Sequence, residues 1–270
     1  MTQADRVTLF HQLHQSGCFV IPNPWDVGSA RLLARLGFKA LATTSSGFAW
    51  SLGRADNQVS LAEALAHIRE IAVNVDVPVS ADFEGGFATA PEDVADNVGV
   101  AAGTGVAGLS IEDSTGDPGA PLFEFQLAVD RIRAARRAID QSGTGIVLTA
   151  RSEGFIVGRP DLPETIRRLT AFAEAGADCL YAPGIRATSD IQAIVTAVAP
   201  KPVNVLVGDG FTTLSDLAAL GVRRISVGGA LARSAWGGFL AAAKEIADKG
   251  TFTNLGRGIP FAEINGSFSR

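Results

Sequence analysis

Eight short apolar segments alternate with longer segments of helical periodicity, and this alternation constrains the fold more than any other feature of the chain. The apolar segments lie at residues 18–23, 38–45, 77–84, 105–114, 145–153, 177–184, 201–208 and 223–229. The helical patterns between them cover residues 27–36, 60–74, 91–103, 124–141, 161–175, 189–199 and 212–220. Eight strand–helix units predict an α/β fold, a (β/α)8 barrel of the TIM type.

A doubly wound open sheet also alternates strands with helices and is the main alternative. Its phosphate-binding turn needs free backbone N–H groups after the first strand, whereas this chain has Pro22 and Pro24 there. We therefore expect the barrel, as a single domain over residues 1–270. The tail at residues 251–270 has no clear periodicity.

The charge, the apolar segments and the cysteines of the chain limit the kinds of partner that it can bind. The net charge of −5 and the scattered Lys and Arg residues argue against nucleic acid as a ligand. No segment reaches the roughly 18 uninterrupted apolar residues of a membrane span. The two cysteines, Cys18 and Cys179, lie in apolar segments, which is typical of buried thiols in a reducing compartment. We expect a cytoplasmic protein that binds a small molecule.

Three of the apolar segments end in charged residues. Side chains alternate between the two faces of a strand, so Asp82 shares a face with Glu84, and Arg151 shares one with Glu153, while Glu112 ends the strand between them. The carboxyl ends of all barrel strands meet at one mouth, where barrel enzymes hold their active sites. Carboxylate oxygens there predict a Mg²⁺ site. The alternative is that these groups are solvated strand ends or partners of Arg151.

Arg151 points to an anionic substrate. Its planar guanidinium matches a carboxylate or an oxyanion that forms during a reaction. A structural ion pair with Glu112 or Glu153 is equally compatible with the spacing.

Several other residues carry weaker signals. Tyr181 ends the sixth strand and is either a proton donor or part of the core. Residues 226–230, Ser-Val-Gly-Gly-Ala, resemble a phosphate-binding turn before the last helix, although close packing explains them equally. The three histidines lie in helical segments, where we expect surface positions rather than a zinc site: His11, His14 and His67.

Six motifs, in order along the chain, together resemble the isocitrate lyase/phosphoenolpyruvate mutase superfamily. They are Asn23-Pro24-Trp25-Asp26-Val27-Gly28-Ser29-Ala30-Arg31, Ser46-Gly47-Phe48, Leu52-Gly53-Arg54-Ala55-Asp56, Ala81-Asp82, Ser110-Ile111-Glu112-Asp113 and Ala150-Arg151-Ser152-Glu153. The resemblance implies a (β/α)8 barrel whose last helix is exchanged between the subunits of a homodimer or homotetramer. We expect that helix at residues 230–248, with Trp236 in the interface.

The resemblance also implies a 2-oxo acid or dicarboxylate at the mouth. Ser46 and Gly47 would hold its carboxylate, with Tyr181 and Asn204 as further substrate-binding residues. Asp56 would lie beside the 2-oxo group.

The same resemblance implies Mg²⁺, with Mn²⁺ as a substitute, anchored through water by Asp82 and Glu112. Arg151 would stabilise the oxyanion, so the expected catalytic residues are Arg151, Asp56 and Glu112. The family carries an acidic residue where this chain has Ser80, and we expect Glu84 to replace it as a metal ligand.

The loop at residues 114–121 departs from the family pattern. It lacks the Cys and His of the lyases and the Asn of the phosphonopyruvate enzymes. We therefore expect a magnesium-dependent lyase that cleaves a C–C bond next to a 2-oxo acid, like an oxaloacetate decarboxylase, because loss of CO2 needs no acid from this loop. The alternatives are an isocitrate, methylisocitrate or malate type of lyase, a C–P bond enzyme, or a non-catalytic protein that binds 2-oxo acids.

Overall fold

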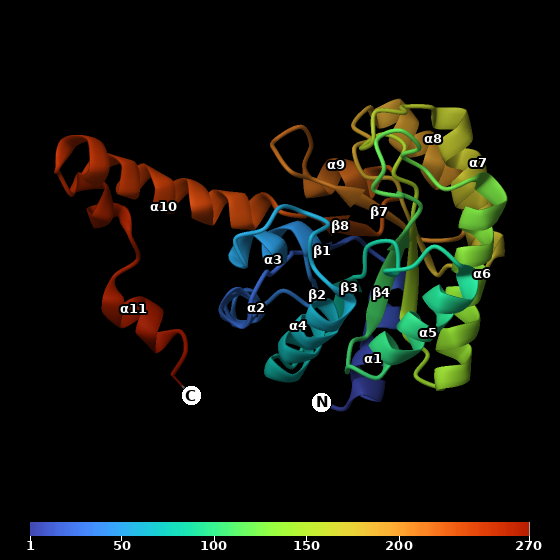
Figure 1. Cartoon of the computed structure of the whole chain (residues 1–270), viewed down its shortest axis with the longest axis horizontal. Coiled ribbons are helices and arrows are strands. Elements are labelled where there is room, and N and C mark those ends of the chain that lie inside the picture. Colours follow the sequence, from blue (N-terminus) through green and yellow to red (C-terminus); the bar gives the residue numbers. More distant parts are fainter. Residues whose placement is uncertain (270) are drawn as a thin grey trace.

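The computed structural model describes residues 1–269 and confirms the predicted (β/α)8 barrel (Figure 1). Its strands are β1 (Phe19–Ile21), β2 (Leu41–Ala42), β3 (Val79–Asp82), β4 (Gly108–Glu112), β5 (Val147–Arg151), β6 (Cys179–Tyr181), β7 (Val203–Leu206) and β8 (Arg224–Ser226). All pairs are parallel, in the order β1-β8-β7-β6-β5-β4-β3-β2. The ring is nearly closed between β1 and β2, where the Pro22 carbonyl accepts a hydrogen bond of 3.1 Å from the Ala42 N–H.

Helices follow the strands along the chain and cover the outside of the ring, except for α1, which precedes β1 and closes one end. They are α1 (Gln3–Gln15), α2 (Val27–Arg35), α3 (Ser45–Ser51), α4 (Leu61–Asn74), α5 (Pro91–Ala102), α6 (Phe125–Ser142), α7 (Leu162–Glu174), α8 (Thr188–Val198) and α9 (Leu214–Ala219). Local sequence explains several ends: Asp26 and Ser60 cap α2 and α4 with capping boxes, and a proline lies in the first turn of α5 and of α7.

Helix α3 lies in a segment that the periodicity did not identify as helical. Thr44 caps it, with its hydroxyl accepting from the Gly47 N–H at 3.3 Å. Seven residues make only two turns, too few for a periodic apolar pattern to appear in the sequence.

The amino-terminal end of the barrel is filled by α1. Phe10 is fully buried, and Gly108 lies so close to its ring that a Cβ at this position would be 2.7 Å from the ring edge. Glycine on β4 therefore makes room for the phenyl ring that closes the floor of the barrel.

Two of the three histidines are buried, so the expectation of surface positions is wrong for them. His14 packs edge-on against Phe10 and Phe19 at 4.6 and 5.1 Å between ring centroids. His67 stacks on Phe48 at 3.7 Å. Burial lowers the pKa of His14 to about 3 and that of His67 to about 4, so both are neutral aromatic members of the interior.

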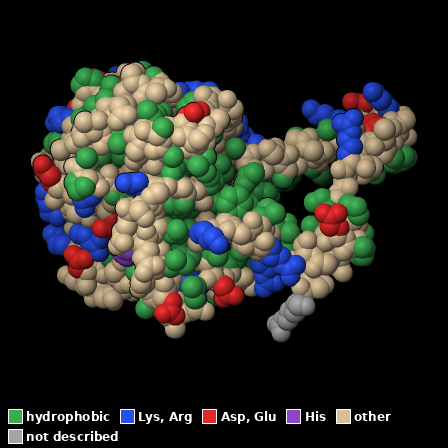
Figure 2. All heavy atoms as spheres, turned by 180° about the vertical axis from the view of Figure 1, so that it is seen from behind, with side chains coloured by type: hydrophobic (Ala, Val, Ile, Leu, Met, Phe, Trp, Pro, Cys, Tyr) green, Lys and Arg blue, Asp and Glu red, His purple; other side chains and the backbone are tan. Residues whose placement is uncertain are grey.

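The C-terminal segments form an arm that projects from the barrel: α10 (Ala230–Lys249), η1 (Thr253–Arg257) and α11 (Phe261–Gly266) (Figure 1). Ala232 is the one buried residue of α10, whereas Trp236, Phe239 and Leu240 are exposed. Figure 2 shows apolar side chains both on this arm and on the barrel face beside it. Across residues 1–269, no helix is both long enough and apolar enough to cross a membrane.

Candidate active site

A polar cavity of about 270 Å³ opens at the carboxyl ends of the strands. Charged and hydroxyl side chains from distant parts of the chain line its wall, and they include Ser46, Asp56, Asp82, Arg151, Tyr181 and Arg224. Strand alternation places Asp82, Arg151 and Arg224 inside the barrel, because their neighbours Ala81, Ala150 and Ile225 belong to the hydrophobic core. Ser46 reaches the cavity from α3, and Asp56 reaches it from the loop after α3.

Arg151 is the centre of the charge network. Its guanidinium contacts Asp82 at 2.7 Å, Glu153 at 2.9 Å and Glu112 at 3.2 Å, so both predicted ion pairs exist together with a third. Burial disfavours the charged guanidinium, but the three carboxylates outweigh it and raise the pKa of Arg151. A fixed cation is thus held at the mouth of the barrel, within an excess of negative charge.

Asp82 connects this network to α3. One carboxylate oxygen accepts from Arg151, and the other accepts from the Ser45 N–H at 3.0 Å. The Asp82 N–H in turn donates to the Thr43 hydroxyl at 2.9 Å. The end of β3 is therefore fixed in position relative to the loop after β2.

Glu84 and Glu112 line an adjoining cavity of about 470 Å³ rather than the one that Asp82 and Arg151 share. Burial, then the charges of Asp82 and Asp56, raise the pKa of Glu84 to about 7. Burial also raises the pKa of Glu112. Asp56 belongs to an exposed loop, but its carboxyl faces the cavity, where burial and Asp82 raise its pKa.

Five carboxylates, of Asp56, Asp82, Glu84, Glu112 and Glu153, surround Arg151, and this excess of negative charge fits a divalent cation. In residues 1–269 no group of three or more His, Cys, Asp or Glu side chains converges closely enough to hold a metal alone. A metal here would therefore complete its coordination with water and with oxygens of the substrate.

Ser46 and Gly47 have different surroundings. The Ser46 hydroxyl lies in the cavity wall, 3.1 Å from the Thr44 hydroxyl. Gly47 is buried, and a Cβ there would lie 2.7 Å from a Thr44 methyl group. The Gly47 N–H is already used by Thr44, so packing by itself requires glycine at this position.

Tyr181 lines the cavity, whereas its register partner Asn204 on β7 is not among the lining residues. The guanidinium of Arg151 is 5.1 Å from the centre of the Tyr181 ring. Burial raises the pKa of Tyr181 to about 12, which makes the phenol a poor acid at neutral pH. Asn204 is buried, donates to the Ser226 hydroxyl at 2.9 Å, and has a side-chain oxygen without a hydrogen-bond donor.

Asn23 is a structural residue of the mouth, a role that sequence reasoning did not identify although the residue begins the first family motif. Its side-chain oxygen accepts from the N–H groups of Val227 and Gly228 at 2.8 and 2.9 Å, and its amide donates to the Thr43 carbonyl at 3.0 Å. Two backbone N–H groups of the turn at residues 226–230 therefore already donate to Asn23 and are not free to bind a phosphate. This favours a packing role for the turn.

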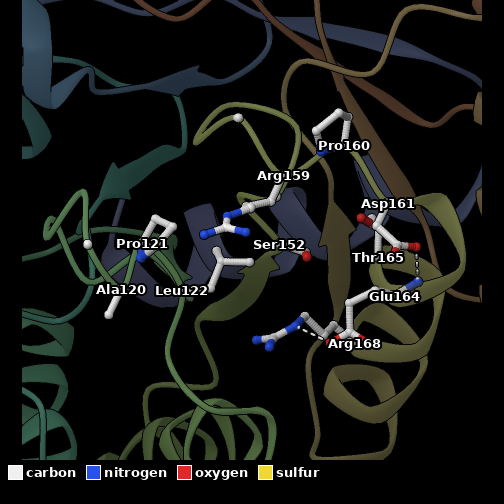
Figure 3. A pocket seen from close by; sticks show the side chains of 13 residues that line it. Ala120, Pro121, Leu122, Ser152, Arg159, Pro160, Asp161, Glu164, Thr165 and Arg168 are labelled. Carbon is white, nitrogen blue, oxygen red and sulfur yellow. Dashed lines mark hydrogen bonds and ion pairs between the residues drawn. The ribbon is translucent and has the colours of Figure 1, made fainter.

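A separate cavity of about 560 Å³ lies between the loops after β4 and β5. Figure 3 shows Pro121 and Leu122 on one side and Arg159 and Pro160 on the other. Its wall includes Arg168, which pairs with the buried Asp113 at 3.2 Å. The acidic groups around Arg151 are outside this cavity, so the smaller central cavity is the candidate active site.

Comparison with known proteins shows the family of the chain. Residues 10–247 match the family model for phosphoenolpyruvate phosphomutase. A crystal structure from Burkholderia cenocepacia J2315, described provisionally as a lyase or mutase, is 48% identical, covers 99% of this chain and 97% of its own, and superimposes with a TM-score of 0.96.

Two further relatives have named activities. The oxaloacetate decarboxylase of Paraburkholderia xenovorans (strain LB400) is 30% identical over 221 residues, which are 79% of this chain and 71% of that protein. A phosphonopyruvate hydrolase, solved with oxalate and Mg²⁺, is 26% identical with a TM-score of 0.83, over 98% of this chain and 95% of its own. These relatives are enzymes that differ in reaction. The chain belongs to the phosphoenolpyruvate phosphomutase family, within the isocitrate lyase/phosphoenolpyruvate mutase superfamily.

Proposed function

We propose that this protein, as one domain over residues 1–270, is a magnesium-dependent lyase that cleaves the C–C bond next to a 2-oxo acid, with oxaloacetate as the type of substrate. The observation that carries the proposal is Arg151, a largely buried cation whose side chain is 15% exposed and is held at the cavity by three carboxylates. Such a site suits a reaction in which negative charge develops on an oxygen of the substrate.

In the proposed reaction the bond from C3 to the departing carboxylate breaks and CO2 leaves. The electron pair moves into the C2–C3 bond, and the negative charge appears on the C2 oxygen. C3 then takes a proton from water, and pyruvate results. Arg151 already points its guanidinium at the cavity, so it needs little reorganisation to stabilise this oxyanion.

Mg²⁺, when bound, would supply a Lewis acid next to the 2-oxo oxygen. Asp82 would hold it, with Glu84, Glu112 and Asp56 acting through water. The raised pKa values of Glu84, Glu112 and Asp56 support this role, since burial outweighs the positive charge of Arg151 at each carboxylate and a divalent cation would compensate it. Ser46 would donate its hydroxyl to the substrate carboxylate, and Tyr181 and Asn204 would border the substrate from below.

The loop after β4 favours decarboxylation. Its residues 114–121 fold into a narrow hairpin, in which Ser114 bridges to Leu122 and the Asp117 side chain accepts from the Gly119 N–H at 2.8 Å. It contains no thiol, imidazole or amide side chain. A reaction whose leaving group needs an acid from this loop would therefore be slow.

A lyase of the isocitrate, methylisocitrate or malate type is the second candidate, supported by the 2-methylisocitrate lyases among the relatives. A protein that binds 2-oxo acids without converting them is the candidate from another class. The products distinguish these candidates from an oxaloacetate decarboxylase: the second lyase would cleave another substrate, and the binding protein would form no product.

Proton NMR would test the proposal. Oxaloacetate, isocitrate and phosphonopyruvate would each be incubated with the enzyme and MgCl2, and the metal-catalysed loss of CO2 from oxaloacetate would be subtracted. We expect pyruvate from oxaloacetate at the highest rate. Rapid isocitrate cleavage would favour the second candidate, and three unchanged substrates would favour the binding protein.

We also propose a homodimer or homotetramer in which α10 packs on a neighbouring subunit, because its apolar face has little of its own chain to cover it. The free thiols of Cys18 and Cys179 support a cytoplasmic location.

A further inference from the structure

Arg224 is the most unusual charged residue of the barrel interior. It is the first residue of β8, is 3% exposed, and faces the lumen next to its register partner Asn204 on β7. Its side chain crosses the barrel to β5, where Nη1 donates to the Thr149 hydroxyl at 2.9 Å. Its guanidinium carbon is 5.9 Å from the centre of the Phe10 ring, so it lies directly above the floor.

Within residues 1–269, no carboxylate pairs with this guanidinium, and its Nε has no acceptor. The other buried or partly buried arginines of the interior have more partners. Arg151 contacts three carboxylates, and Arg168 contacts Asp113 and Glu164. Arg131 donates to three backbone carbonyls, and Arg6 donates to two. Arg224 has a single hydrogen-bond acceptor, the Thr149 hydroxyl.

The groups around Arg224 do not supply the missing negative charge. Burial raises the pKa of both the Cys179 thiol and the Tyr181 phenol, so both are neutral, and His14 is uncharged as well. Asp82, the carboxylate that acts on Arg224 from a distance, is engaged by Arg151. A guanidinium stays protonated at neutral pH, and a buried charge without a partner is costly.

The guanidinium also lines the candidate active site, together with Asp82, Arg151 and Ser46. A ligand in this cavity therefore meets two cations: Arg151, already neutralised by the protein, and Arg224, which is not. The counterion that Arg224 lacks is thus expected on the ligand.

We propose that Arg224 is the receptor for a second carboxylate of the substrate and so sets specificity for 2-oxo dicarboxylates over 2-oxo monocarboxylates. This inference rests on the proposed function for the substrate class. The first carboxylate lies toward Ser46, and the second points to the floor, where the Thr149 hydroxyl holds the guanidinium in place. The ion pair with the departing carboxylate is made in the bound substrate and is lost as CO2 forms, so removal of Arg224 should raise KM without lowering kcat.

Ligand binding by calorimetry tests this without turnover. The probes are 3,3-difluorooxaloacetate, a dicarboxylate, and pyruvate, a monocarboxylate, each with the magnesium-loaded enzyme. Arg224→Gln should weaken binding of the dicarboxylate at least about 30-fold while pyruvate changes less than about threefold. Arg223→Gln is the matched control, because the adjacent Arg223 donates to the Gly17 carbonyl outside the cavity.

Thr149→Val keeps the charge but removes the hydroxyl that orients it, and it should weaken dicarboxylate binding several-fold in the same direction. If Arg224→Gln does not fold, Thr149→Val provides the test of the receptor role. Equal effects of these variants on both probes, or no effect on either, would overturn the role of Arg224. Selective loss of the dicarboxylate in an enzyme that converts none of the substrates would leave the receptor standing and refute the proposed reaction instead. If Arg224→Gln converts oxaloacetate with an unchanged KM, the proposed reaction stands and the receptor role of Arg224 is refuted.

Discussion

At the scale of single residues, the candidate site contains one cation that is fully neutralised by the protein and one that is not. Arg151 is held by Asp82, Glu112 and Glu153, and its geometry depends on a fork with several donors in fixed directions. Lysine has the same charge but a single ammonium group, so it cannot keep all these contacts and also face the substrate.

Arg151→Lys should therefore lower kcat for oxaloacetate by about 10²-fold, by analogy with the removal of an oxyanion donor. Steady-state kinetics would measure this. Arg186→Lys is the control, because Arg186 forms an exposed pair with Asp209. A change in KM alone would show that Arg151 binds the substrate without stabilising the transition state.

Asp82→Ala should weaken Mg²⁺ binding, since Asp82 lies among the other acidic groups and ends β3 at the mouth. Titration calorimetry would compare it with Asp76→Ala, whose side chain is 98% exposed. Equal metal affinities of wild type and Asp82→Ala would place the metal elsewhere.

At the scale of elements, the barrel depends on one side chain where its ring is weakest. Asn23 follows β1 and joins the loop after β2 to the turn after β8. Asn23→Ala would remove the side-chain partner of two partly buried N–H groups and of the Thr43 carbonyl.

We expect Asn23→Ala to lower the free energy of unfolding by about 2–4 kcal/mol in urea denaturation. Asn23→Asp keeps the oxygen that accepts from Val227 and Gly228 and should lose less. If the two substitutions cost the same, the two amides do not depend on Asn23.

The elements of the barrel could be predicted from sequence, and the contacts across it could not. Strand alternation was enough to bring Asp82, Glu112 and Arg151 to one mouth, because each lies at the carboxyl end of its own strand. Asn23 was missed because its partners are 204 and 205 residues away. Arg224 was missed because an arginine at the start of a strand resembles a polar strand end, and only the packing of α1 shows that this position is interior.

At the scale of the whole molecule, acid sensitivity has an identifiable source. The pKa of His14 falls from 6.5 to about 3 on burial, so the unfolded chain binds a proton that the folded protein excludes. Stability from this group is complete above pH 6.5 and is lost as the pH falls below it, by about 2 kcal/mol at pH 5. Glu84, with its pKa raised to about 7, acts in the opposite direction.

A comparison of variants isolates the histidine. Between pH 7.5 and pH 5, His14→Gln should lose about 2 kcal/mol less unfolding free energy than wild type. His11→Gln, in the same helix, should behave like wild type. The same loss in all three proteins would assign the acid sensitivity to other groups.

The arm makes a prediction about assembly. Trp236 and Phe239 contact one another at 5.6 Å between ring centroids and stay exposed on α10. We expect a dimer or tetramer by light scattering at micromolar concentration, and a shift toward monomer in Trp236→Asp. Arg137→Asp, on α6 at the opposite side of the barrel, should not change the mass (Figure 1). A monomeric wild type would exclude the exchanged arm.

Phe10 closes the barrel beneath Arg224, and this closure has a kinetic consequence. With the floor filled, whatever enters at the mouth must leave by the same opening, so reactant and product use one route in opposite directions. A product that keeps one carboxylate then occupies the path of the next reactant until it diffuses out. Release is therefore expected to compete directly with entry, and product inhibition should be purely competitive.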